Sequence, residues 1–279
     1  MNELKVVLVL TLFRRPERTR QILAALDACY NVAAIPVYLS CDYAPEYADA
    51  CREVFAVAHG WVKKEMAAGR CNRHVLKYAT NLGIDLHKID AIASALAWSG
   101  ADSFILMEDD TPPFAVWNDK EPEKTPIAPD VLNYFCTMLA RTADEPDTLA
   151  VCGYNRQGDE AAFDAVKGQP YGMFRSVGFN PWGWAMTKAQ WQRFFGDGGK
   201  EYAAHVDCPN GRFDWWLHSQ GLQVVQPVLA RTNHVGGDLA THTPSQEWLE
   251  ENELSRWGAW SLPPETLPDN GLFTWDEVS

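Results

Sequence analysis

Short apolar runs alternate with amphipathic segments along the first half of the chain. The apolar runs are rich in β-branched residues and too short for buried helices, which indicates buried parallel strands. We expect such strands at residues 4–12, 35–41, 77–80 and 102–107. Between them, apolar residues recur at the spacing of one helix face, which predicts helices. These helices cover residues 17–28, 47–66 and 84–98, the first of them preceded by Pro16.

This alternation of strand and helix predicts an α/β fold with a mostly parallel central sheet flanked by helices on both faces. Ligands of such sheets bind beyond the carboxyl ends of the strands. Arg14, Asp42 and Asp110 each follow closely after a predicted strand. We therefore expect these three side chains at one edge of the sheet.

The pattern is weaker in the second half, where we expect helices at 131–140 and 213–220 and strands at 149–154 and 224–230. A Trp-rich turn and an amphipathic helix are expected within 181–195. Residues 112–129 contain five prolines, which predicts a surface loop. No change in composition marks a second domain. We predict one domain over 1–243 and an acidic C-terminal tail, 244–279, that wraps around the same domain.

The composition of the 279 residues is typical of a globular protein, with 47% hydrophobic and 22% charged residues. The 37 Asp and Glu against 24 Lys and Arg give a formal charge of −13, which disfavours general attraction to nucleic acid or an anionic membrane. The seven cysteines are odd in number and form no C-x-x-C pair, which favours reduced thiols. No stretch approaches the ~20 apolar residues of a membrane span. We expect a cytoplasmic protein with no membrane segment and no obligatory protein partner.

Glu108, Asp109 and Asp110 form the most informative motif. They follow the apolar strand predicted at 102–107 and precede Thr-Pro-Pro, which continues neither a strand nor a helix. Adjacent carboxylates repel one another unless a cation neutralises them, and oxygen ligands suit Mg²⁺ or Mn²⁺. A cation held there would bridge the phosphates of a nucleotide and stabilise a leaving diphosphate. The alternative is a solvated acidic turn.

Other polar residues near strand ends allow either a binding or a structural interpretation. Asp42 is placed to accept a hydrogen bond from a nucleobase N–H, or to start a turn. Arg14 and Arg15 are suited to a phosphate or to stacking on a base, or are solvated charges. A lone histidine on a predicted helix, such as His87, is more often a structural residue than a ligand contact.

Two later segments leave the same choice open. Asp214, in Arg-Phe-Asp-Trp-Trp, is either a helix N-cap or a carboxylate made more basic by its aromatic neighbours, as a general base requires. Residues 231–243 are polar, Gly-rich and contain two histidines, which suits a loop closing over a diphosphate or a plain surface loop. No Walker A, GxGxxG, GxSxG or HExxH pattern is present, which excludes the usual P-loop, Rossmann dinucleotide, α/β-hydrolase and zincin classes.

Taken in order, these segments resemble the metal-dependent GT-A glycosyltransferases, most closely the N-acetylglucosaminyltransferase I type, which are inverting enzymes that use UDP-sugars. The resemblance covers residues 4–243. It rests on the segments VLVLTLFRR, IPVYLSCD, DLHKIDAIASALAWSGADSFILMEDD, AVCGYNRQG, FNPWGWAMTKAQW, FDWW and ARTNHVGGDLATH. It implies the GT-A fold, a Rossmann-like fold of nucleotide-diphospho-sugar transferases.

The resemblance also implies roles for individual residues. Asp110 is similar to the carboxylate that binds the metal, and Glu108 and Asp109 are similar to contacts with the donor sugar and ribose. Asp214 is similar to the general base that deprotonates the acceptor hydroxyl. The other implied donor-site positions are Arg14, Asp42 and His87 at the nucleoside, Gly236, Thr241 and His242 in a loop over the diphosphate, and Trp182 and Trp184 beside the sugar and acceptor.

We therefore expect a Mn²⁺- or Mg²⁺-dependent inverting glycosyltransferase that moves a sugar from UDP-glucose or UDP-N-acetylglucosamine to an acceptor hydroxyl, with a glycan as the leading acceptor. One alternative acceptor is DNA with hydroxymethylated bases, as viral base-modifying glucosyltransferases use. A group of basic residues could follow its phosphate backbone, although the net charge favours a solvated helix face. This group comprises Lys63, Lys64, Arg70, Arg73 and Lys77. Two further alternatives are a nucleotidyltransferase and a catalytically silent sugar-nucleotide-binding module.

Overall fold

The structure is a computed structural model that describes residues 4–113, 128–154, 172–196, 220–228 and 230–234. Strands and helices alternate in its first half, in the order β1 (Val6–Leu12), α1 (Pro16–Asp27), β2 (Val37–Cys41), the short 3-10 helix η1 (Pro45–Tyr47), α2 (Ala48–Ala67), β3 (Arg73–Lys77), α3 (Ile84–Ser99) and β4 (Ser103–Glu108). The second half contains α4 (Val131–Thr142), β5 (Thr148–Cys152), β6 (Met173–Ser176), β7 (Trp184–Thr187), α6 (Lys188–Gly196) and β8 (Gln223–Pro227).

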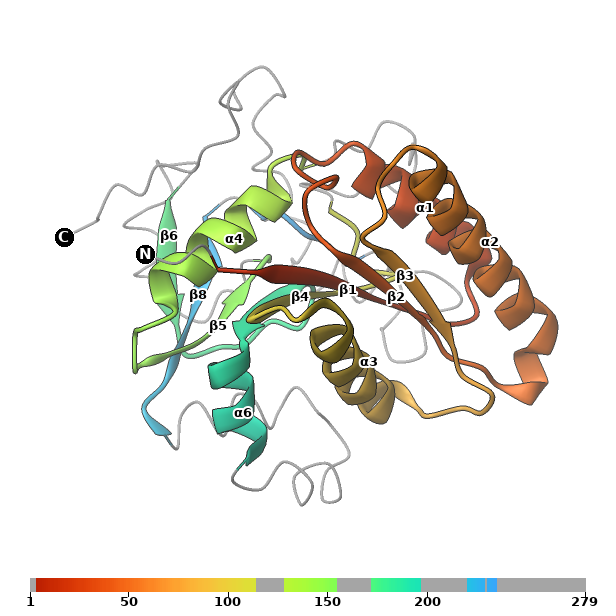
Figure 1. Cartoon of the computed structure of the whole chain (residues 1–279). Coiled ribbons are helices and arrows are strands. Elements are labelled where there is room, and N and C mark those ends of the chain that lie inside the picture. The colour runs from red at the N-terminus through yellow and green to blue at the C-terminus, as the bar shows by residue number, and fades with distance from the viewer. Residues whose placement is uncertain (1–3, 114–127, 155–171, 197–219, 229, 235–279) are drawn as a thin grey trace, which may run out of the picture.

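The eight strands of the described residues belong to one sheet in the order β3-β2-β1-β4-β7-β5-β8-β6. Figure 1 draws the strands of this sheet as arrows. The pairs β1–β2, β1–β4, β2–β3 and β5–β8 are parallel. Strand β7 runs antiparallel to both β4 and β5, and β6 runs antiparallel to β8. The carboxyl ends of β1, β2 and β4 therefore lie at one edge of the sheet, as the sequence pattern predicts.

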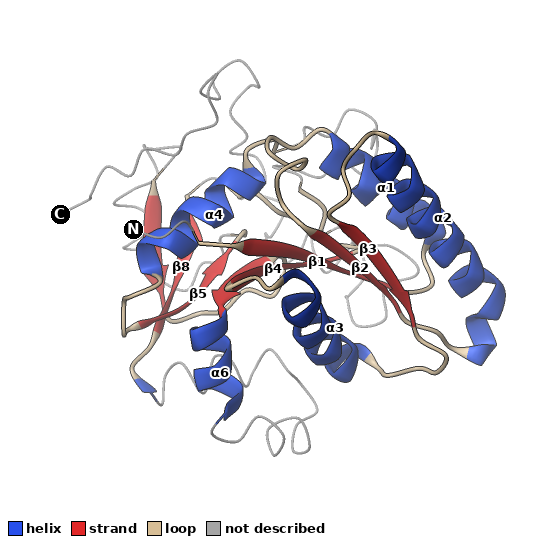
Figure 2. Cartoon of the chain, in the orientation of Figure 1, coloured by secondary structure: helices blue, strands red, loops and turns tan. Residues whose placement is uncertain are grey.

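Strand β1 lies in the interior and is buried along its whole length. Its side chains alternate between the two faces of the sheet. Leu8 and Leu10 pack in the hydrophobic cluster that includes α1, α2 and α4, whereas Val7 and Val9 pack in the cluster that includes α3 and α6. Figure 2 shows the same arrangement, with α1, α2 and α4 on one side of the strands and α3 and α6 on the other. The predicted α/β fold with helices on both faces is confirmed.

Most predicted elements of the first half are confirmed within a few residues, but one strand is displaced. The expected strand at 77–80 is instead β3, which covers Arg73–Lys77. The chain leaves the sheet after Lys77 because the segment that follows is held by Asp42, whose carboxylate accepts a hydrogen bond from the Leu82 N–H at 3.1 Å. The buried position of Arg73 depends on a distant carboxylate, which the local sequence pattern does not show.

In the second half, the helix expected at 131–140 and the strands expected at 149–154 and 224–230 are confirmed as α4, β5 and β8. Two four-residue strands, β6 and β7, are missing from the prediction, and β7 lies within the segment 181–195 that was expected to hold only a turn and a helix. The helix expected at 213–220, the tail 244–279 and most of the loop 112–129 lie outside the described residues. Among the helices that the structure describes, none has the length and apolar character needed to cross a membrane.

Candidate active site

A tight turn presents the acidic motif at the end of β4. The Glu108 N–H donates a hydrogen bond to Thr111 Oγ1 at 2.7 Å, and the Thr111 N–H donates back to the Glu108 carbonyl at 3.0 Å. The Asp109 N–H donates to the Thr11 carbonyl of β1 at 3.1 Å. These bonds close the turn on itself and tie it to the neighbouring strand β1, so the three carboxylates are held at the sheet edge rather than on a loose loop.

Each of the three carboxylates has a cationic or imidazole partner. Arg15, the residue before α1, bridges Asp109 and Asp110, with Arg15 Nη1 2.8 Å from Asp110 Oδ2. Lys88 of α3 lies with its Nζ atom 2.8 Å from Glu108 Oε1. His234 lies with its Nε2 atom 3.6 Å from the same Asp110 oxygen that Arg15 contacts. The motif is therefore a partly buried cluster of paired carboxylates and not a solvated acidic turn.

The two aspartates experience different electrostatic environments. Burial raises the pKa of Asp109 to about 6, although Arg15 opposes that rise. Burial would also raise the pKa of Asp110, but the neighbouring His234 and the charge of Arg15 outweigh it and hold this pKa well below its ordinary value. Asp110 therefore stays ionised well below neutral pH, as a cation ligand must, and Asp109 is the carboxylate that takes up a proton first as the pH falls.

The donor atoms of this cluster fit a divalent cation that substrate phosphates would complete. Asp109 Oδ2 is buried and has no hydrogen-bond partner among the described residues. Asp110 and His234 offer a carboxylate and an imidazole, which suit Mn²⁺. No group of three or more His, Cys, Asp or Glu side chains is arranged to hold a metal ion in the part of the chain that the structure describes. A cation bound by one or two protein ligands usually takes its remaining ligands from phosphates and water.

The residues expected at the nucleoside lie at the carboxyl ends of β1 and β2 and on α3. Buried Asp42 accepts a hydrogen bond from the Tyr43 N–H at 2.9 Å in addition to that from Leu82. The Nε2 atom of buried His87 lies 2.9 Å from Ser40 Oγ, and burial lowers the pKa of His87 to about 4, so this imidazole is neutral. The guanidinium carbon of Arg14 lies 4.2 Å from the centre of the Tyr47 ring.

The structure separates the two tryptophans that were expected beside the sugar and acceptor. The Trp184 ring is 4% exposed and packs against Phe104 at 5.3 Å and Phe179 at 5.5 Å between ring centres, within the hydrophobic core. Trp184 therefore belongs to the hydrophobic core, and its predicted contact with the donor stays a prediction. The Trp182 ring lies 5.0 Å from the His234 ring, next to the acidic cluster.

A closely packed contact holds the segment that carries His234. The N–H groups of Arg231 and Thr232 both donate to the Gly153 carbonyl, at 2.7 and 3.1 Å. A Cβ atom on Gly153 would lie 2.5 Å from Thr232 Oγ1, so only glycine permits this approach. Arg231 Nε also lies 3.0 Å from Asp130 Oδ2 in a buried ion pair. His234 is thus anchored to the end of β5 and the start of α4.

Sequence reasoning missed the bridging position of Arg15, the Lys88–Glu108 pair and His234. Lys88 follows His87 directly, and His234 belongs to the polar segment 231–243. The sequence therefore draws attention to both positions, but it does not show which carboxylate each of them contacts. The predicted site residues Asp214, Gly236, Thr241 and His242 lie outside the described residues. Apart from Trp184, the other predicted positions lie toward one edge of the sheet, and their roles in binding stay predictions.

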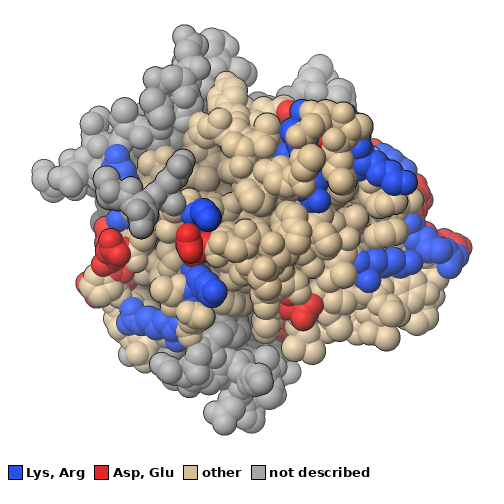
Figure 3. All heavy atoms as spheres, viewed as in Figure 1, with Lys and Arg blue, Asp and Glu red and all other residues tan. Residues whose placement is uncertain are grey.

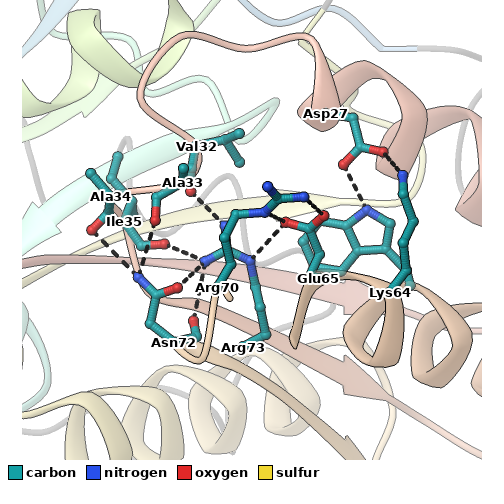
Figure 4. Close-up of polar contacts among 11 residues, drawn as sticks. Asp27, Val32, Ala33, Ala34, Ile35, Lys64, Glu65, Arg70, Asn72 and Arg73 are labelled. Carbon is teal, nitrogen blue, oxygen red and sulfur yellow. Dashed lines mark hydrogen bonds and ion pairs between the residues drawn. The ribbon is translucent and has the colours of Figure 1, made fainter. Parts of the chain in front are cut away.

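The basic group considered for a DNA backbone is largely neutralised. Arg73 is buried, donates hydrogen bonds to the carbonyls of Val32 and Ile35 and lies 3.5 Å from Glu65 (Figure 4). Arg70 pairs with Glu65 as well, and Lys64 pairs with Asp27. On the face shown in Figure 3, Lys and Arg side chains near α1 and α2 lie beside Asp and Glu side chains. Lys64, Arg70 and Arg73 are therefore paired within the protein, which disfavours their use on a phosphate backbone.

No protein-family model and no curated protein sequence matches the chain, whereas 72 chains of solved structures do. GalNAc-T7, in a crystal structure with UDP, GalNAc and Mn²⁺, is 11% identical, with a TM-score of 0.51 over 84% of this chain and 44% of its own. The chain has the GT-A fold.

Two further matches have lower TM-scores. An active-site mutant of LgtC is 12% identical over 93% of this chain and 98% of its own, with a TM-score of 0.42. Mannose-1-phosphate geranyltransferase from Thermus thermophilus is 14% identical over 82% of this chain and 75% of its own, with a TM-score of 0.43. The GalNAc-T7 match, at 11% identity, concerns the fold alone, so the reaction must be argued from the site.

Proposed function

We propose that the protein is a glycosyltransferase with a nucleoside diphosphate sugar as its donor. The observation that supports this most strongly is the cluster of Glu108, Asp109, Asp110, Arg15 and His234 at the carboxyl ends of β1 and β4 of a GT-A fold. A diphosphate leaving group needs positive charge at its oxygens, and this cluster offers a guanidinium beside carboxylates able to hold a cation.

The proposed nucleotide is UDP, in keeping with the resemblance to the N-acetylglucosaminyltransferase I type. Asp42 accepts described hydrogen bonds from two backbone N–H groups, and a carboxylate has about four acceptor positions. It therefore retains capacity for the ring N–H of a pyrimidine. Neutral His87 lies beside it, and Arg14 with Tyr47 offers a flat cationic surface for a base or ribose. The proposed sugar is glucose or N-acetylglucosamine.

The proposed metal is Mn²⁺ or Mg²⁺, held by Asp110 and His234 together with oxygens of the donor diphosphate. When bound, such a cation supplies Lewis-acid stabilisation of the leaving diphosphate. Arg15 then provides a second positive charge next to the same group, and Lys88 keeps Glu108 paired. The presence of UDP and Mn²⁺ in the GalNAc-T7 structure is consistent with this proposal.

The transfer step proposed is a single displacement with inversion. A carboxylate, for which Asp214 is the candidate, removes the proton of the acceptor hydroxyl while that oxygen bonds to the anomeric carbon. The bond between the anomeric carbon and the diphosphate oxygen breaks, and UDP leaves with its electron pair. The proposed acceptor is a glycan hydroxyl, and residues 236–242 are proposed to cover the diphosphate.

The test is UDP release from a panel of UDP-sugars with Mn²⁺, compared with the same panel in EDTA and without an added acceptor. We expect slow, metal-dependent hydrolysis of one donor, because water can replace the acceptor hydroxyl. Asp110→Asn should lower this release by at least roughly a hundredfold, the order seen when one electrostatic contact to a leaving group is lost. The matched control is Asp49→Asn, at a side chain that is 95% exposed on α2.

Silence of every UDP-sugar, together with no thermal stabilisation by UDP, would contradict the proposal. Release of inorganic diphosphate from a nucleoside triphosphate would instead identify a nucleotidyltransferase. UDP binding without turnover of any donor would identify a silent binding module. Transfer to hydroxymethylated DNA that falls steeply with added salt would identify a DNA acceptor.

A further inference from the structure

Arg15 occupies an unusual position for a residue at the start of a helix. Its side chain is only 15% exposed, and its two terminal nitrogens contact different carboxylates, those of Asp109 and Asp110. Its carbonyl accepts hydrogen bonds from the Thr19 N–H at 2.9 Å and Thr19 Oγ1 at 3.0 Å, so its backbone is fixed within the first turn of α1. The guanidinium therefore has a well-defined place at the centre of the acidic cluster.

The contact with Asp110 involves the oxygen that a cation would need. Asp110 Oδ2 lies 2.8 Å from Arg15 Nη1 and 3.6 Å from His234 Nε2. A divalent cation held between Asp110 and His234 would compete with the guanidinium for this oxygen and would be repelled by its charge. Arg15 would stay paired with its second carboxylate, Asp109, when a metal ion replaces it at Asp110.

The described protein ligands also leave the cation incomplete without a phosphate. Asp110 and His234 supply two donor atoms, and the described residues offer no third carboxylate or imidazole arranged with them. Oxygens of a bound diphosphate would add ligands for the metal and at the same time accept hydrogen bonds from a guanidinium. A bound diphosphate thus stabilises both the cation at Asp110 and the guanidinium of Arg15 once the two have separated.

We propose that Arg15 competes with the divalent cation for Asp110 and thereby makes metal binding depend on the nucleoside diphosphate. This inference rests on the proposed function. In the free protein, Arg15 is the counter-ion of Asp110, and the Arg15–Asp110 ion pair is exchanged for a cation–Asp110 contact when the nucleotide binds. By linkage, the nucleotide raises metal affinity by the same factor by which the metal raises nucleotide affinity, and Arg15 increases that factor.

The experiment measures Mn²⁺ binding directly, from the free Mn²⁺ signal in electron paramagnetic resonance, with and without UDP. Arg15→Met removes the competing charge and keeps an apolar side chain in its place. We expect this variant to bind Mn²⁺ roughly tenfold more tightly than the wild-type protein without UDP, and UDP to raise its Mn²⁺ affinity less than in the wild type. Arg15→Lys keeps the positive charge but carries it on a single nitrogen, without the fork by which Arg15 reaches Asp109 and Asp110 from two nitrogens. It should give an intermediate Mn²⁺ affinity, and it guards against misfolding of the first variant.

The control is Arg20→Met, on the same helix but paired with Glu17 and Glu53 at the surface, and it should leave both affinities unchanged. Equal or weaker Mn²⁺ binding by both Arg15 variants without UDP would overturn the inference while leaving the proposed function intact. If the wild-type protein binds UDP but no Mn²⁺ under any condition, the metal-dependent part of the proposed function fails, and the inference fails with it. If it binds neither UDP nor Mn²⁺, the proposed donor site itself is wrong.

Discussion

Asp109 and Asp110 are adjacent in the sequence, yet the fold gives them different chemistry. Both share Arg15, but only Asp110 also has His234 beside it. The additional partner offsets the cost of burial, so Asp110 stays ionised, whereas burial keeps the pKa of Asp109 near 6. The motif therefore contains one carboxylate suited to a cation and one whose main contact is the guanidinium.

Lys88 is the residue whose substitution tests the charge balance of the cluster. Lys88→Met leaves Glu108 without its ammonium partner, which makes the site more negative and disfavours an anionic diphosphate. We expect KM for the UDP-sugar to rise roughly tenfold, with a smaller change in kcat, because the lost interaction acts on binding. Steady-state kinetics with the donor identified in the panel measure both parameters.

The double variant Lys88→Met/Glu108→Gln separates charge balance from simple disruption. Removal of both charges restores the balance, so KM should recover part of the loss. Lys63→Met, at an exposed position on α2, is the matched control and should behave as the wild type. A twofold change in KM corresponds to roughly 0.4 kcal/mol of binding energy. A KM for Lys88→Met within twofold of the wild-type value would therefore show that the pair has no part in donor binding.

The acidic motif could be located from the sequence because its signal is local, an apolar strand followed by charged residues and prolines. The two tryptophans of Pro-Trp-Gly-Trp could not be separated in that way. Gly183 has φ +78° and turns the chain, so Trp182 lies beside His234 while Trp184 enters the core as the first residue of β7. The position of His234 depends on contacts of Arg231 and Thr232 with Gly153, a residue distant in sequence. No local pattern distinguishes His234 from His242 in the same segment.

At the scale of elements, the end of α2 is fastened to the sheet by a buried ion-pair network. Glu65, on the last turn of α2, is 1% exposed and pairs with Arg70 and Arg73 (Figure 4). Arg73, the first residue of β3, also donates to the Val32 and Ile35 carbonyls before β2. The network lies at the amino ends of β2 and β3, opposite the candidate active site, so it serves stability.

Glu65→Gln tests this network. Removing one member of a buried ion pair leaves Arg73 without its counter-charge, and we expect the free energy of unfolding to fall by about 3 kcal/mol at pH 7. The control is Lys64→Met, which removes an exposed pair with Asp27 and should cost less than about 1 kcal/mol. Urea unfolding followed by circular dichroism measures both variants.

The stability difference between the wild type and Glu65→Gln should also depend on pH. The hydrogen bond from Arg70 lowers the pKa of Glu65 below its ordinary value of 4.5. A carboxylate whose pKa is lower in the folded state stabilises the fold above pH 4.5, and this contribution is lost as the pH falls through the folded-state pKa. The difference between wild type and Glu65→Gln should therefore shrink below pH 4.5, and a difference that stays constant down to acid unfolding would contradict the ion-pair explanation.

The elements that could be predicted from the sequence are those whose stability is visible in their own periodicity, such as β1 and α2. Strands β6 and β7 have four residues each, too few for alternation to be recognised, and they exist because β4, β5 and β8 pair with them. The shift of β3 from 77–80 to Arg73–Lys77 has the same origin, since a buried Arg is acceptable only beside Glu65. In each of these three strands, contacts with residues distant in sequence determine where the strand forms.

At the scale of the whole molecule, the candidate active site joins the two halves of the chain. Asp42, His87 and the acidic motif belong to the first half, whereas His234 and Trp182 come from the second half. Strand β7 pairs with β4 and β5 and connects the halves within the sheet. A ligand held by Asp110 and His234 together would therefore link them a second time, and that link should appear in the stability of the folded protein.

Thermal unfolding with UDP, with Mn²⁺ and with both measures that link. A ligand present at a hundred times its Kd adds about 2.7 kcal/mol of stability, which corresponds to a rise in Tm of roughly 5–10 °C for a chain of this size. We expect UDP with Mn²⁺ to raise Tm more than UDP in EDTA. His234→Ala should abolish the Mn²⁺-dependent increment but keep the stabilisation by UDP alone, because the proposed nucleoside contacts lie in the first half. His59→Ala on α2 should keep both effects, and a full Mn²⁺ increment in His234→Ala would show that the cation is held without the second half of the chain.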